Sequence, residues 1–160
     1  MMFSQTTLKC SSRKAALFAV LVAMMTSVSP SAEAATNYSA KSFTVEVQGK
    51  GNPVIMIPGL MSDSRVWQQT ASELRKTHQL HLVSIAGFAG QPAIEGALLP
   101  VVKTELLDYI KTQQLQRPAI IGHSLGAFLA YDLASSAPDT IGKIIAVDGL
   151  PYLAPVFTRD

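Results

Sequence analysis

The sequence GHSLG at residues 122–126 constrains the fold of this chain more than any other stretch. It follows a short apolar run that begins at Pro118, and an apolar pattern typical of a helix continues from it to Ala134. A serine held where a strand turns abruptly into a helix points outward from the strand's end, and flanking glycines permit that turn without side-chain clashes. The stretch therefore predicts a strand, a sharp turn that presents the hydroxyl of Ser124, and a helix.

Apolar runs without alternation lie at residues 54–57 and 80–85, and each is typical of a strand covered on both faces. Residues 119–122 are expected to form the central strand and residues 143–147 a further one. Between them, apolar residues three or four apart indicate helices: Trp67, Ala71 and Leu74; Val102, Leu106 and Ile110; Leu125, Leu129 and Leu133. Alternating strands and helices imply parallel crossovers, so we expect an α/β fold with a doubly wound, mostly parallel sheet and ligand chemistry at the strands' carboxyl ends.

The residues ahead of the first covered run are more polar. Ser42 to Gln48 alternates apolar and polar side chains, which predicts a half-exposed strand. Ala35 to Ala40 is expected to form a loose tail. Trp67 is expected to pack in the core, and a ring that stacks on substrate is the alternative.

The N-terminus has the layout of a secretory signal peptide. A basic segment precedes an apolar run from Ala15 to Val28, and small residues follow up to Ala34. We therefore expect residues 1–34 to be a signal peptide cleaved after Ala34, residues 35–160 to form the mature domain, and the location to be secreted or periplasmic. Because the apolar run is short for a bilayer, an uncleaved anchor is the less favoured alternative, and we expect no stable membrane insertion after cleavage.

Charge and cysteine content exclude several functions for the mature chain. The sequence has 13 Lys and Arg against 11 Asp and Glu, and cleavage after Ala34 would leave ten of each. With equal numbers of basic and acidic residues, the mature chain has no excess positive charge with which to bind nucleic acid. We therefore expect no nucleic-acid partner. The only cysteine, Cys10, lies in the predicted signal peptide, and no cluster of His, Cys or Asp has metal-ligand spacing. We expect no thiol chemistry, no metal and no cofactor.

Two further loops follow predicted strands and would share an edge of the sheet with Ser124. They are Pro58-Gly59-Leu60 and the glycine-rich residues 87–91. With these motifs in this order, the chain from Phe43 to about Leu153 resembles the first two-thirds of an α/β-hydrolase of the serine esterase or lipase type. In that family GHSLG is the nucleophile elbow, residues 58–60 match a loop that usually reads His-Gly-x, and residues 87–91 match a Gly-x-Gly loop.

The resemblance implies that Ser124 is a nucleophile. It also implies that the backbone N–H groups of Leu60 and Leu125 form the oxyanion hole, which requires no particular side chain at either place. Asp148, which follows the strand at residues 143–147, is a candidate triad acid; a solvated loop carboxylate is the alternative. A serine that only caps the following helix is the alternative for Ser124.

The histidines do not match the family's order of nucleophile, acid and a late histidine. His123 adjoins Ser124, so both side chains cannot face one reacting atom, and packing beside the elbow is expected for it. His78 and His81 are expected at the opposite edge, where a helix returns to a strand. Because the chain stops at Asp160, we expect a fragment that lacks the last strands, the cap and the histidine. Such a fragment would be nearly inactive alone, since a lost triad member leaves only about 10³–10⁴ of acceleration over water.

The resemblance implies an exported serine hydrolase that cleaves small-molecule carboxylic esters, or related acyl bonds, through an acyl-enzyme on Ser124. Two alternatives remain. GHSLG also occurs in malonyl-carrier acyltransferases, but the signal peptide and residues 58–60 argue against an acyltransferase. A non-catalytic binding domain on a hydrolase scaffold would explain the absence of a usable histidine, whereas the intact elbow argues against it.

Overall fold

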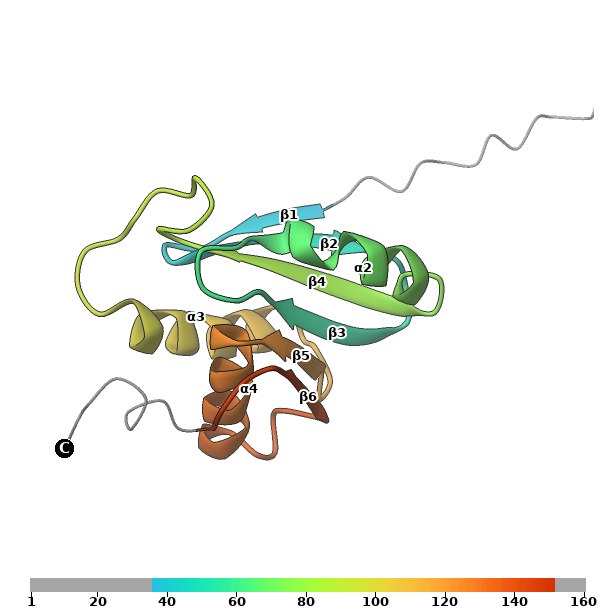
Figure 1. Cartoon of the computed structure of the whole chain (residues 1–160). Helices are drawn as coiled ribbons and strands as arrows, with labels where there is room; N and C mark the ends of the chain where they lie inside the picture. The colour runs from blue at the N-terminus through green and yellow to red at the C-terminus, as the bar shows by residue number, and fades with distance from the viewer. Residues whose placement is uncertain (1–35, 152–160) are drawn as a thin grey trace, which may run out of the picture. The chain divides into compact units, whose positions relative to one another are not determined.

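A computed structural model describes residues 36–151, in which one sheet of six strands forms the centre of the fold (Figure 1). The strands are β1 (Thr36–Ser39), β2 (Phe43–Gln48), β3 (Asn52–Ile57), β4 (His78–Ile85), β5 (Ala119–His123) and β6 (Ile144–Val147). Their order is β1-β2-β4-β3-β5-β6. The pairings from β4 through β3 and β5 to β6 are parallel, whereas β1 with β2 and β2 with β4 are antiparallel. The predicted α/β fold with a mostly parallel sheet is confirmed.

Helices pack on both faces of this sheet and divide its core in two. The helices are the 3₁₀ turn η1 (Ser64–Trp67), α2 (Gln68–Leu74), α3 (Leu98–Thr112) and α4 (Leu125–Ser136). Buried residues of α3 and α4 share one cluster with the strands, while Trp67 and Ala71 belong to a second cluster with β3 and β4. β3 and β4 are buried from both sides by this arrangement, as their lack of alternation predicts, whereas β6 leaves Ile145 and Val147 exposed. Between residues 36 and 151, no helix has the length and apolar character needed to span a membrane.

Residues 36–39 form an edge strand, so the prediction of a loose tail there is wrong. β1 pairs antiparallel with β2 over its whole length. The Tyr38 ring lies 4.7 Å from the Tyr109 ring and 6.3 Å from the Phe43 ring, centroid to centroid. These long-range contacts determine the strand, and the polar local sequence gives no sign of them. The predicted signal peptide and its cleavage position lie outside the described residues.

The two long helices agree with the sequence pattern in their buried faces. Val102, Leu106 and Ile110 of α3 are buried, as predicted. The helix begins at Leu98, two residues before Pro100, which occupies the first turn, where a missing N–H costs no helical hydrogen bond. In α4, Leu129 and Leu133 are buried as predicted, whereas Leu125 is only partly buried, and the helix ends before Pro138.

Candidate functional site

The chain makes the sharp turn that GHSLG predicts. β5 ends at His123, α4 begins at Leu125, and Ser124 between them has φ 51° and ψ −111°. This left-handed conformation is strained for a residue with a side chain. A Cβ on Gly122 would meet the carbonyl group of Gly126, and one on Gly126 would meet the carbonyl oxygen of Ile57. Both glycines are therefore required by the close approach of backbone to backbone.

Backbone hydrogen bonds hold Ser124 and leave its side chain unused. Its N–H donates to the carbonyl oxygen of Val147 at 2.9 Å, and its carbonyl oxygen accepts from Ala127 at 3.0 Å and Phe128 at 3.1 Å. The hydroxyl does not cap α4. Within residues 36–151 it has no hydrogen-bond partner, and the residue is only partly buried. A capping role for Ser124 is thus wrong, and the hydroxyl is available for other chemistry.

The loop after β3 lies directly against this turn. β3 and β5 are neighbours, with Ile57 opposite Gly122. A Cβ built on Gly59 would lie 3.3 Å from the Cβ of Ser124 and 2.8 Å from Nδ1 of His123. The structure therefore brings residues 58–60 and Ser124 together, as the sequence predicts.

Two backbone N–H groups at this junction are unpaired. Leu125 is the first residue of α4, so its N–H has no acceptor inside the helix. Leu60 lies in a turn that the N–H of Ser62 closes by donating to the carbonyl oxygen of Gly59 at 3.3 Å. In the part of the chain that the structure describes, neither N–H donates a hydrogen bond. Both are free to donate to a bound oxygen atom.

Asp148 lies at the same edge, directly after β6. It is exposed, has φ 48°, and has no hydrogen-bond or ion-pair partner among the described residues. The next residue presses on the elbow, because a Cβ on Gly149 would meet the Cβ of Ala127 and lie 2.9 Å from the Ser124 carbonyl oxygen. The end of β6 is thus in contact with the turn, and the role of Asp148 as an acid stays a prediction. The sequence does not predict that glycine is required at position 149, because the contact is with residues that are distant in the chain.

His78 and His81 occupy different positions in β4. His78 is its first residue, at the amino end, as predicted. His81 is the fourth residue and is 2% exposed, so its predicted place at the edge of the sheet is wrong. The strand begins two residues earlier than its apolar run, because polar residues extend the pairing with β3.

Polar contacts within the core bind His81. Its Nδ1 lies 2.7 Å from the hydroxyl of Tyr109, and its Nε2 lies 3.3 Å from Oε1 of Gln79. Burial lowers the pKa of His81 to about 4 and, together with repulsion from Tyr38, raises the pKa of Tyr109 to about 12. His81 is therefore a neutral core residue, engaged far from the carboxyl ends of the strands.

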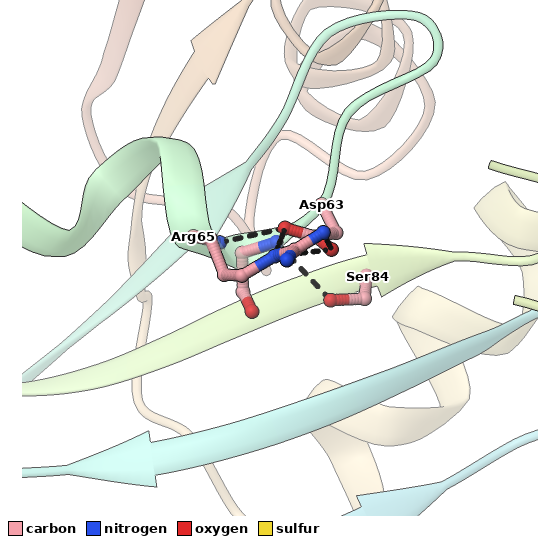
Figure 2. Close-up of polar contacts among 4 residues, drawn as sticks. Asp63, Arg65 and Ser84 are labelled. Carbon is pink, nitrogen blue, oxygen red and sulfur yellow. Dashed lines mark hydrogen bonds and ion pairs between the residues drawn. The ribbon is translucent and has the colours of Figure 1, made fainter. Parts of the chain in front are cut away.

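A polar cluster fixes the chain that follows Leu60 (Figure 2). Oδ1 of Asp63 accepts from the backbone N–H of Arg65 at 2.9 Å, and its Oδ2 lies 2.8 Å from Nη2 of Arg65. Nε of Arg65 donates to Oδ1 at 3.0 Å and to Oδ2 at 2.9 Å, and this side-chain hydrogen bonding lowers the pKa of the Asp63 carboxyl. The N–H of Ser64 donates to Oγ of Ser84 on β4 at 3.1 Å. Asp63 caps η1, and the cluster joins the loop to the sheet.

Trp67, the last residue of η1, lies in the core. It is 8% exposed and packs with Val54, Met56, Leu80 and Leu82. The prediction of core packing is confirmed, and the stacking role is wrong.

Comparisons with known proteins agree with this geometry. The alpha/beta hydrolase family matches residues 54–160. A biotin biosynthesis bifunctional protein of Cellvibrio japonicus is 35% identical over 117 residues, which are 67% of this chain and 22% of that protein. The pimeloyl-[acyl-carrier protein] methyl ester esterase of Vibrio vulnificus is 27% identical over 109 residues, 68% of this chain and 41% of the esterase.

Solved structures of hydrolases also align with this chain. A marine microorganism esterase aligns with a TM-score of 0.61 and 27% identity over 66% of this chain and 41% of its own. A putative epoxide hydrolase from Pseudomonas aeruginosa has a TM-score of 0.67 at 21% identity, over 79% of this chain and 44% of its own, and this likeness concerns the fold alone. The chain spans less than half the length of each of these relatives. The match from residue 54 to residue 160 and the shared sheet together place the chain in the alpha/beta hydrolase family.

Proposed function

We propose that the protein is a serine hydrolase that cleaves carboxylic esters through an acyl-enzyme on Ser124. The observation that carries the proposal is the strained conformation of Ser124, with its hydroxyl unpaired beside two free backbone N–H groups. Strain of this kind persists where function requires it. The esterases among the relatives support an ester as the substrate.

The proposed reaction gives each of these groups a part. Oγ of Ser124 attacks the carbonyl carbon of the ester, and the carbonyl oxygen gains the negative charge. The N–H groups of Leu60 and Leu125 donate hydrogen bonds to that oxyanion, and the amino end of α4 adds a favourable dipole. A base, which we expect the full-length protein to supply, takes the proton from Oγ and gives it to the alcohol oxygen as the ester C–O bond breaks. Water, deprotonated by the same base, then attacks the acyl-enzyme, and breaking of its bond to Oγ releases the acid and restores Ser124. Asp148 is the proposed acid that would orient a base.

We also propose that the 160 residues alone are nearly inactive toward esters. Ser124 needs a base, and the three histidines of the sequence are poorly placed to serve. His78 is at the far end of β4, His81 is engaged in the core, and His123 is the chain neighbour of Ser124 and lies against Gly59. A full-length gene product that supplies a histidine would be the active form.

A covalent probe tests the nucleophile. The full-length protein as its gene encodes it should form a stable adduct with a fluorophosphonate, and mass spectrometry should locate it on Ser124. Ser124→Ala should abolish the adduct, whereas Ser136→Ala, at the other end of α4, should keep it. An unlabelled full-length protein would reject the hydrolase and favour the non-catalytic binding domain.

We propose further that the protein is exported and that its first 34 residues are removed. The support is the layout of the N-terminal sequence. Expression in a Gram-negative host followed by N-terminal sequencing of the periplasmic fraction should give a chain that begins at Ala35. Recovery of uncleaved protein from the cytoplasm alone would contradict export.

A further inference from the structure

The loop that follows the oxyanion turn carries an unusual set of exposed apolar side chains. Leu60 is 59% exposed, Met61 77% and Val66 52%. Met61 and Val66 border a shallow hollow of about 430 Å³ together with Ala89 from the loop after β4. Large apolar side chains gathered at one place on a surface indicate a binding region, unlike single scattered ones. Leu60, Met61 and Val66 are called here the apolar surface of the loop.

Met61, the most exposed of these side chains, is held outward by a strained backbone conformation. Met61 has φ 60°, at a place in the turn of residues 59–62 where glycine is the favoured residue. A methionine that is 77% exposed makes few contacts that could offset this strain. The turn therefore keeps an apolar side chain beside the site where a glycine would be easier to fold.

Charge around the hollow does not oppose an apolar ligand. The two charged residues that line it are Asp63 and Arg65, and they form an ion pair with each other at 2.8 Å. The Asp63 side chain is only 12% exposed. Neither residue offers an unpaired charge for recognition of an ionic group.

We propose that the apolar surface of the loop binds the aliphatic acyl chain of the substrate, so that the enzyme prefers esters of medium-chain acids to acetates. This inference rests on the proposed function. When the carbonyl oxygen accepts from the N–H of Leu60 at about 3 Å, the carbonyl carbon on Ser124 is only one bond farther away. The acyl chain then starts beside Leu60 and can leave the site over Met61 and Val66. Apolar area removed from water along this path stabilises longer chains.

The test compares octanoate and acetate esters of p-nitrophenol with the full-length protein. The wild type should give a higher kcat/KM for octanoate. Met61→Gly and Val66→Ser should each lower the ratio of octanoate to acetate kcat/KM about tenfold, as expected for lost apolar contact. Met61→Gly also relieves the positive φ, so a folding defect is not expected from it. Ile145→Thr on β6, which replaces a side chain of 55% exposure, should leave the ratio unchanged.

Any other result would overturn the inference. A wild type that prefers acetate, or variants with the wild-type ratio, would exclude the acyl chain from this surface. If Met61→Gly instead alters the preference between octyl and ethyl acetate, the surface binds the alcohol part. Fluorophosphonate labelling of Ser124 separates this failure from failure of the proposed function, because labelling persists when only the acyl assignment is wrong.

Discussion

The ring of His123 leaves no room for a methyl group on Gly59. A Cβ built there would lie 2.8 Å from Nδ1 and 3.2 Å from Cε1 of that ring. Real Cβ atoms essentially never come within 3.0 Å of another heavy atom, so one of the two residues would have to move. The loop that carries the N–H of Leu60 and the turn that carries Ser124 are therefore packed together through this pair.

Gly59→Ala should displace the loop and reduce catalysis. Loss of one oxyanion donor costs about 10²–10³ in kcat in studied enzymes, and we expect a loss within that range with little change in KM. Adding His123→Ala should restore part of kcat, since it removes the ring that the new methyl group meets. Steady-state kinetics of the two single variants and the double variant check this coupling. A double variant no better than Gly59→Ala would contradict it.

Ser124→Gly should stabilise the fold while it abolishes ester hydrolysis. Glycine adopts φ 51° without strain, and relief of about 1–3 kcal/mol exceeds the 0.5–1 kcal/mol that its extra chain entropy costs. Ser124→Ala is the matched control, because it removes the hydroxyl but keeps the Cβ and the strain. In urea denaturation, the free energy of unfolding of Ser124→Gly should exceed those of Ser124→Ala and of the wild type. Equal stability of the two variants would show that no strain is stored at the elbow.

Gly126→Ala should destabilise the protein strongly. Its methyl group would meet the carbonyl oxygens of Ile57 and Pro58, which are backbone atoms that cannot turn aside. We expect a loss of about 1–3 kcal/mol in the free energy of unfolding, the usual cost of overpacking. Gly90→Ala is a useful comparison, because φ there is 88° but nothing lies within 4 Å of the added carbon. A smaller loss of unfolding free energy for Gly90→Ala than for Gly126→Ala, measured by urea denaturation, would distinguish the cost of an atomic collision from the cost of backbone strain.

Acid should weaken the fold through His81. Burial lowers its pKa from 6.5 to about 4, so the folded protein holds this ring neutral while the unfolded chain protonates it near pH 6.5. The stability that this difference contributes is complete above pH 6.5 and falls between pH 6.5 and 4, because the unfolded state binds more protons there. His81→Gln should flatten the dependence of unfolding free energy on pH in that window. A wild-type dependence in His81→Gln would contradict this assignment.

The sequence predicts the parts of the fold that local pattern determines. GHSLG predicts the turn at Ser124, since its geometry depends on glycines within two residues of it. Unbroken apolar runs predict the central parallel strands, because burial on both faces demands them. The apolar spacing of α3 likewise predicts its buried face.

Contacts between distant segments were not predictable in this way. β1 exists because residues 36–39 pair with β2 and Tyr38 packs on aromatic rings, although its own residues are polar. β4 begins at His78 because β3 provides a parallel partner for it. The needs for Gly59 and Gly149 come from neighbours far away in the chain. Patterns of composition contain none of this information.

The hydrogen bond from the N–H of Ser124 to the carbonyl oxygen of Val147 gives the molecule an internal reporter. β6 is an outer strand of the described sheet, and outer strands open more readily than central ones. Each time β6 detaches, this one amide loses its acceptor and can exchange its hydrogen with solvent. The exchange rate at Ser124 therefore measures how often β6 releases the residue that we propose as the nucleophile.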